Sequence, residues 1–202
     1  MNVASHKPYD ARLAAWLVAP LIDSRVTPNH LTFVRFVVGA AGAVLFALGS
    51  HPNAAALLVV ASNFLDHTDG ELARMSGKTS RFGHYFDLAS DALVTVAMFV
   101  GMGLGLVATL GAKAAWMGAS AGIAVAGIFH LRNVIENRHG KTATRQPRFA
   151  GFEAEDVLYL IPIVTLSGGL SGFLHAAAIG APIAFCIVLA QYIAIGRQAG
   201  RA

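Results

Sequence analysis

The sequence predicts an all-α integral membrane protein, with an interfacial amphipathic helix over residues 10–23 and a bundle of six transmembrane helices over residues 31–195. Two observations predict this class. Hydrophobic residues make up 55% of the 202-residue chain, and charged residues make up only 13%, about half their share in a typical soluble domain. The apolar residues are also grouped in six blocks, most of which approach the roughly 20 residues that a helix needs to cross a bilayer. We interpret residues 1–202 as a single domain.

The segment over residues 10–23 is predicted to form a short helix with one apolar face. Four apolar residues recur in it at three- and four-residue spacing, namely Leu13, Trp16, Leu17 and Leu21. Two placements fit this pattern: a helix in the cytoplasmic membrane interface with Trp16 as an anchor, or a helix packed against the bundle. The next helix is predicted to begin with Thr27 as its N-cap and Pro28 at its first position.

The six apolar blocks are the predicted transmembrane helices, and they cover residues 31–48, 54–72, 88–110, 114–131, 157–170 and 174–195. The fifth block is short and contains Pro162, Gly168 and Gly169, so its limits are the least well defined. Small residues are dense at 39–43 and 101–105, where they would let helices pack closely in lipid or, alternatively, form a homodimer face. The single Cys186 excludes an intramolecular disulfide.

The basic residues predict how the protein is oriented in the cell (inner) membrane. If the N-terminus is cytoplasmic, fourteen of the fifteen Lys and Arg residues lie on or near the cytoplasmic side, and only Lys113 lies opposite. Arg35 is among the fourteen, one turn inside the first predicted span. This bias is the positive-inside pattern. The net charge of +4 is therefore explained by contact with anionic lipid and phosphorylated substrates, and not by binding to nucleic acid.

Four aspartates interrupt the apolar chain at helical spacing. Asp66 and Asp69 are three apart at the cytoplasmic end of the second span, and Asp87 and Asp91 are four apart at the start of the third. Each pair lies on one helix face, and the short connection predicts that the two helices are antiparallel neighbours, so we expect the carboxylates to converge. Carboxylates at membrane depth are costly unless they are paired, bind metal or face water. The pattern therefore predicts a polynuclear site for Mg²⁺, Mn²⁺ or Ca²⁺.

Small residues continue the acidic face of the second span. Gly70 and Ala73 lie four positions after Asp66 and Asp69, so a flat ligand such as a nucleotide base could approach the backbone there. Arg74 follows directly and can pair with a phosphate or an acid. A cation transporter or ion-binding membrane protein is the rival class, but it predicts acids spread across the bilayer instead of gathered at one end.

Eight positions form the pattern D-x2-D-G-x2-A-R-x8-G-x3-D-x3-D, namely Asp66, Asp69, Gly70, Ala73, Arg74, Gly83, Asp87 and Asp91. This pattern resembles the signature of the CDP-alcohol phosphatidyltransferase family, and every defining position is present. The resemblance implies an enzyme that displaces CMP from CDP-diacylglycerol, or a related CDP-alcohol, with an alcohol acceptor. It also implies two divalent ions, Mg²⁺ or Mn²⁺, and a homodimer. A family alternative transfers a CDP-activated headgroup to a lipid alcohol, and a non-catalytic relative is disfavoured by the intact motif.

The resemblance also implies roles for individual residues. The metal ligands would be Asp66, Asp69, Asp87 and Asp91, and Asp91 would also act as the base on the acceptor hydroxyl. The CDP-linked donor would be bound by Asn29, His30, Leu31, Thr32, Asp66, Asp69, Gly70, Ala73, Arg74, Ser80 and Gly83. The candidates for binding the acceptor are Arg132, Lys141, Arg145 and Arg148.

The identity of the acceptor stays open at the level of sequence. Relatives with sugar-phosphate acceptors carry a Glu-Arg pair near the acids at residues 153–156, and here an acidic residue replaces the arginine. This substitution weakens the expectation of a phosphorylated acceptor and admits a neutral or cationic one. Alternatively, these acids pair with the arginines of the preceding loop.

Overall fold

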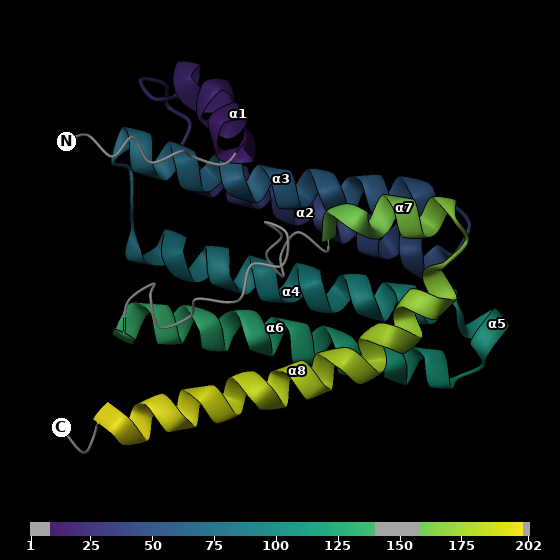
Figure 1. Cartoon of the computed structure of the whole chain (residues 1–202). Helices are drawn as coiled ribbons and strands as arrows, with labels where there is room; N and C mark the ends of the chain where they lie inside the picture. The colour runs from purple at the N-terminus through teal and green to yellow at the C-terminus, as the bar shows by residue number, and fades with distance from the viewer. Residues whose placement is uncertain (1–8, 140–157, 200–202) are drawn as a thin grey trace.

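The computed structural model describes residues 9–139 and 158–199, and every regular element in those ranges is helical. Five long helices form the body of the protein (Figure 1). They are α2 (Pro28–Leu48), α3 (Pro52–Ser76), α4 (Arg81–Gly105), α6 (Lys113–His139) and α8 (Leu170–Ala199). The short elements are α1 (Tyr9–Val18), η1 (Ala19–Leu21), α5 (Val107–Leu110) and α7 (Ile161–Leu166). The predicted all-α fold is confirmed.

Within the described residues, four helices are long and apolar enough to cross a membrane, namely α2, α4, α6 and α8. They are consistent with an integral membrane protein. Helix α3 has the same length as α4, but its C-terminal half carries two aspartates, Glu71 and Arg74. These charges explain why α3 is not among the four, and the predicted count of six spans is not confirmed.

The limits predicted for the fifth span are wrong. The described part of residues 157–170 contains a 3-10 turn at 158–160 and the six-residue helix α7, which is about 9 Å long. The chain turns at Gly168, whose φ of 70° is a left-handed conformation suited to glycine, and α8 begins at Leu170. An apolar run of this length therefore predicted one span where the described chain has a short helix and a turn.

Helix α1 combines the two placements that the sequence left open. One of its faces packs against α3 and buries Ala14 and Val18. The opposite face exposes Leu13, Trp16 and Leu17, and the Trp16 side chain is 72% exposed. The helix is thus docked on the bundle and still presents an apolar face of the kind that binds a membrane interface.

Helix α2 packs along both α3 and α4, whereas α3 and α4 barely touch each other. The prediction that the two acid-bearing helices are direct neighbours is therefore wrong. Their connection is short because α3 ends at Gly77 (φ 68°) and Ser80 caps α4, its hydroxyl accepting a hydrogen bond from the Gly83 N–H at 2.9 Å. Such a short link keeps both acidic ends at one level of the bundle, on either side of α2 (Figure 1).

Glycines on two faces of α4 allow its close contact with α2 and α6. A Cβ added at Gly105 would lie 2.0 Å from the Phe46 carbonyl oxygen of α2. A Cβ added at Gly103 would lie 2.4 Å from the Ala114 carbonyl oxygen of α6. No side chain fits at such distances, so these positions in the segment 101–105 are packing positions within the chain, as predicted.

Replacing Gly103 by Ala should destabilise the bundle, because the new methyl group meets backbone that cannot rotate away. Overpacking of this kind costs about 1–3 kcal/mol. Thermal unfolding of the purified protein in detergent should show a lower melting temperature. The matched control is Gly180→Ala in α8, where a Cβ meets nothing within 4 Å. There the melting temperature should stay unchanged or rise slightly, and equal losses in both variants would contradict the packing argument.

Candidate metal centre

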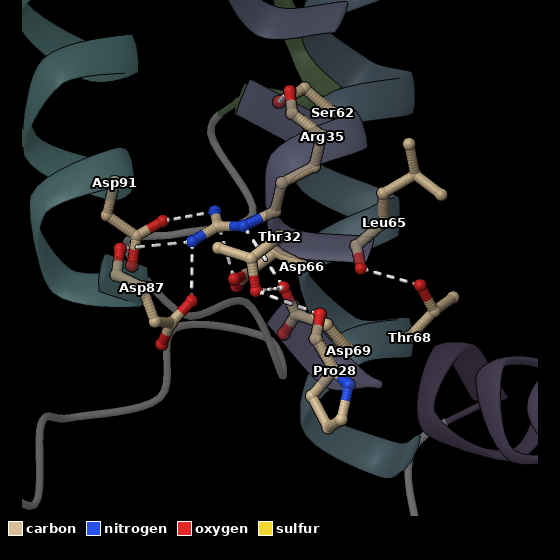
Figure 2. Close-up of polar contacts among 10 residues, drawn as sticks. All are labelled: Pro28, Thr32, Arg35, Ser62, Leu65, Asp66, Thr68, Asp69, Asp87 and Asp91. Carbon is tan, nitrogen blue, oxygen red and sulfur yellow. Dashed lines mark hydrogen bonds and ion pairs between the residues drawn. The ribbon is translucent and has the colours of Figure 1, made fainter. Parts of the chain in front are cut away.

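The four motif aspartates converge on the guanidinium group of one residue, Arg35 of α2 (Figure 2). From the α3 side, Asp66 Oδ1 lies 3.0 Å from Arg35 Nη1, and Asp69 Oδ2 lies 3.2 Å from Nε. From the α4 side, Asp91 Oδ1 lies 2.5 Å from Nη1, and Asp87 Oδ1 lies 2.6 Å from Nη2. The structure thus brings the four carboxylates together, as their spacing predicts.

Arg35 is the site residue that the sequence reasoning missed. Its side chain is only 3% exposed, and Nη2 also donates to the Asp87 backbone carbonyl at 3.2 Å. The Ser62 hydroxyl donates to the Arg35 carbonyl oxygen at 2.8 Å, which joins α3 to α2 at this level. The signal was present in the sequence, because a cation inside an apolar span requires an anionic partner.

The four carboxylates differ in their surroundings. Asp69 is the most enclosed, with its side chain 6% exposed, and its Oδ2 lies 2.8 Å from the Thr32 hydroxyl oxygen. That hydroxyl also lies 3.1 Å from the Pro28 carbonyl oxygen, so its one proton is shared between two acceptors. The side chains of Asp66, Asp87 and Asp91 are 33%, 37% and 40% exposed. The cluster therefore has a closed side at Asp69 and an open side at the other three acids.

Three of the acids fit a divalent cation. Asp66, Asp69 and Asp87 each offer a carboxylate oxygen, and these oxygens lie within 4.8 Å of one another. Hard oxygen ligands of this kind suit Mg²⁺ or Mn²⁺. Asp91 is outside that group of three but shares Arg35 Nη1 with Asp66. Four carboxylates against one guanidinium leave three negative charges in excess, which favours the binding of divalent ions.

A second ion pair lies beside the acid cluster on α3. Arg74 Nη2 lies 3.1 Å from Glu71 Oε1, and Glu71 is buried whereas Arg74 is largely exposed. A Cβ added at Gly70 would meet only the Arg74 guanidinium, at 3.5 Å. Glu71 thus holds the guanidinium over the gap that Gly70 leaves, next to half-buried Ala73.

The residues at the starts of α2 and α4 also meet. A Cβ added at Gly83 would lie 2.5 Å from Asn29 Oδ1 and 3.0 Å from Ser80 Oγ, so the absence of a side chain lets α2 approach α4. The ring of His30 accepts a hydrogen bond at Nδ1 from the Thr27 N–H at 3.2 Å and so caps its own helix. Leu31 is half-buried beside it.

The predicted acceptor residues are described only in part. Arg132 is half-buried on α6, which packs against α4. The other three candidates, Lys141, Arg145 and Arg148, lie outside the described residues, as do the acids at 153–156.

The fold and the site together define a class: a helical membrane protein with a carboxylate cluster suited to divalent cations at one end of its bundle. The family model for CDP-alcohol phosphatidyltransferase matches residues 25–195, and the chain belongs to this family. The resemblance inferred from the eight motif positions is thereby confirmed.

Three relatives illustrate the similarity. The chain is 38% identical over 80 residues to the archaetidylinositol phosphate synthase of Pyrococcus horikoshii, a match that covers 40% of this chain and 42% of that protein. It is 26% identical over 172 residues to the phosphatidylinositol phosphate synthase of Cutibacterium acnes, covering 82% of this chain and 80% of that protein. The chain spans less than half of the length of the first curated relatives that it matches.

The third relative is a solved structure. The crystal structure of Mycobacterium tuberculosis phosphatidylinositol phosphate synthase with CDP-DAG bound has a TM-score of 0.61 to this chain, at 22% sequence identity, and the match covers 90% of both chains. The two proteins share a fold.

Replacing Thr32 by Val should lower the stability of the metal-free protein, because it removes a hydroxyl donor from the enclosed carboxylate of Asp69. A hydrogen bond to a charged group contributes about 1.5–3 kcal/mol. Denaturant unfolding in detergent with EDTA measures the loss. The matched control is Thr165→Val, whose hydroxyl donates only to the Pro162 carbonyl oxygen of its own helix. An equal or larger loss in the control would contradict the assigned role of Thr32.

Proposed function

We propose that the protein is a metal-dependent phosphatidyltransferase that moves the phosphatidyl group of CDP-diacylglycerol, or of a related CDP-activated lipid, to an alcohol and releases CMP. The observation that carries this proposal is the meeting of all four acids of an intact family motif at one point between α3 and α4. The CDP-DAG bound to the M. tuberculosis relative supports the choice of donor.

The proposal includes the architecture and location that the sequence predicts. Residues 1–202 would form one domain with six transmembrane helices in the cell (inner) membrane, working as a homodimer. The N-terminus and the acid cluster would face the cytoplasm, since fourteen of fifteen basic residues fall on or near that side. In this orientation the lipid tails of the donor stay in the bilayer while the acceptor arrives from the cytoplasm.

The acids would hold two divalent ions, Mg²⁺ or Mn²⁺. Their ligands would be Asp66, Asp69, Asp87 and Asp91, and the ions would supply charge stabilisation at the phosphoryl oxygens of the donor. The chain itself keeps the acids in place, with Thr32 bonded to the enclosed Asp69 and Ser62 joining α2 to α3. Preorganised groups of this kind need no rearrangement when charge develops.

Asp91 is the proposed general base. Its side chain is 40% exposed on the open side of the cluster, so an acceptor hydroxyl can approach its carboxylate. The carboxylate would take the hydroxyl proton across a hydrogen bond. The acceptor oxygen then forms a bond to the phosphorus of the phosphatidyl group, and the bond from that phosphorus to the CMP oxygen breaks.

The donor would lie over the small-residue face of α3. Gly70 and Ala73 present almost no side chain to the cytosine ring, and the Arg74 guanidinium that lies over Gly70 would pair with the donor phosphate. The starts of α2 and α4, with Asn29 and Ser80, border the same end of the bundle. His30, Leu31 and Thr32 would complete the donor site on the first turn of α2.

Inositol phosphate is the first acceptor to test. Two of the relatives are named for making phosphatidylinositol phosphate, which arises from a phosphatidyl group only if the acceptor already carries the inositol and its phosphate. The basic residues Arg132, Lys141, Arg145 and Arg148 are the candidates for binding that phosphate.

The direct test is CMP release from CDP-diacylglycerol with Mn²⁺ and each of four alcohols: inositol phosphate, glycerol phosphate, serine and choline. Release that instead requires a CDP-linked headgroup and a lipid alcohol would favour headgroup transfer. Cation flux in liposomes without nucleotide would favour the transporter class. The gathering of the acids at one end of the bundle argues against that class. No CMP from any donor and acceptor would overturn the proposal.

Replacing Asp91 by Asn should reduce kcat by at least about 100-fold, because general base catalysis typically contributes 10²–10⁴. Binding of CDP-diacylglycerol should be retained, and steady-state CMP release with a separate donor-binding titration measures both quantities. The matched control is Asp23→Asn, which makes the same change at an exposed site outside the cluster. A near-normal rate in Asp91→Asn would exclude the base role.

Replacing Arg74 by Gln should raise the KM for the donor about tenfold, because a charge-assisted hydrogen bond to phosphate is lost. Glu71→Gln should act in the same direction but less, since Arg74 remains and only its position is released. The double variant should raise KM by less than the product of the two single effects, because residues in one ion pair do not act additively. Steady-state kinetics of the three variants measure this. Additive effects on KM would show that Glu71 acts independently of Arg74.

A further inference from the structure

Arg35 occupies the position that divalent cations would otherwise share with the acids. Its guanidinium lies within 3.2 Å of an oxygen of each of the four aspartates. The donor set that fits a divalent ion is formed by three of those same acids. A cation bound by these carboxylates and the Arg35 guanidinium therefore compete for the same oxygens.

The charges explain why a resident cation is needed. Four carboxylates gathered in an apolar bundle repel one another strongly unless positive charge is close. A guanidinium stays protonated under all ordinary conditions, so Arg35 supplies a permanent positive charge at the centre of the cluster. It reduces the excess from four negative charges to three without any bound ion.

The fit of Arg35 to the cluster is incomplete. Its Nε atom is buried without a hydrogen-bond partner among the described residues, although Asp69 Oδ2 lies 3.2 Å away. The Thr32 hydroxyl already contacts that oxygen. A buried donor without an acceptor costs free energy, so the ion pairs do not use the full capacity of the guanidinium. Nε is therefore the guanidinium nitrogen that the cluster holds least firmly.

In a displacement, the Arg35 side chain would move while its backbone stays in place. The Arg35 backbone is fixed by the Ser62 hydroxyl on its carbonyl oxygen, whereas the side chain has several rotatable bonds. Asp66, Asp87 and Asp91 are each at least 33% exposed, so an ion can enter from the open side of the cluster.

We propose that Arg35 is a built-in counter-cation, which holds the acid cluster together when no divalent ion is bound and competes with divalent ions for the carboxylate oxygens. The inference rests on the proposed function in one respect, that the acids bind divalent ions. It assigns Arg35 a positioning role that sets metal affinity and preserves the site between metal-binding events. If Arg35 only supported the geometry of the acids, its removal would weaken metal binding. Because Arg35 competes with the metal, its removal should strengthen metal binding.

The test is a Mn²⁺ titration of the purified full chain in detergent, followed by electron paramagnetic resonance, without nucleotide or acceptor. Arg35→Gln should bind Mn²⁺ at least about tenfold more tightly than the wild type. A factor of about ten corresponds to the smallest coupling energies measured between close charge pairs. In EDTA the melting temperature of Arg35→Gln should fall below that of the wild type, and added Mn²⁺ should reduce the difference. The matched control is Arg25→Gln, which removes the same charge at an exposed site outside the cluster and should change Mn²⁺ affinity by less than about twofold.

Unchanged or weaker Mn²⁺ binding by Arg35→Gln would overturn the inference, as would a wild type that binds no Mn²⁺. If Arg35→Gln aggregates, the same Mn²⁺ titration of Arg35→Lys tests the inference. A compact ammonium contacts fewer carboxylate oxygens than the guanidinium fork. Arg35→Lys should therefore bind Mn²⁺ more tightly than the wild type by a smaller factor, and weaker binding overturns the inference. None of these measurements needs turnover, so an absence of CMP release would defeat the proposed function separately.

Discussion

This structure depends on one constraint: the repulsion among four carboxylates in an apolar bundle must be offset by nearby positive charge. The Arg35 guanidinium lies among the four carboxylates and offsets part of their repulsion, and it reaches them because α2 packs along both α3 and α4. The helix order follows from the same requirement. Helix α2 carries the cation, and α3 and α4 carry the acids, so the charged centre joins three helices that also pack through small residues.

Much of this could be predicted from the sequence. The composition and the apolar blocks predicted the helical class, and the spacing of the aspartates predicted that they would meet. Periodicity shows which face of a helix a residue occupies, but not which helix that face meets. For that reason the spacing of the aspartates predicts α3 and α4 as neighbours and does not indicate that Arg35 of α2 lies between them. Helix limits were missed where polar ends extend a helix, as at Arg81, or where a left-handed glycine interrupts an apolar run, as at Gly168.

Two small motifs serve both local structure and the site. Ser80 ends the link between α3 and α4 by capping α4, and this cap positions Gly83 against Asn29 of α2. His30 caps α2 through the Thr27 N–H, which leaves Thr32 one turn into the helix and within reach of Asp69. The family resemblance implies that these residues contact the donor, and the structure shows that Ser80 and His30 cap their helices.

The backbone contacts that α4 makes through the glycines at 101–105 are far from the acids. Phe46 of α2, which meets Gly105, lies about 16 Å along its helix from Arg35. At that end backbone packs directly against backbone, whereas the acidic ends are joined by the ion pairs that Arg35 makes with the aspartates. A tilt of about 4° between α2 and α4 about the glycine contacts would shift their acidic ends by about 1 Å. That shift is several times the ~0.2 Å tolerance of metal–ligand distances. A small bending of the bundle by the surrounding lipid would therefore change the spacing of the carboxylates.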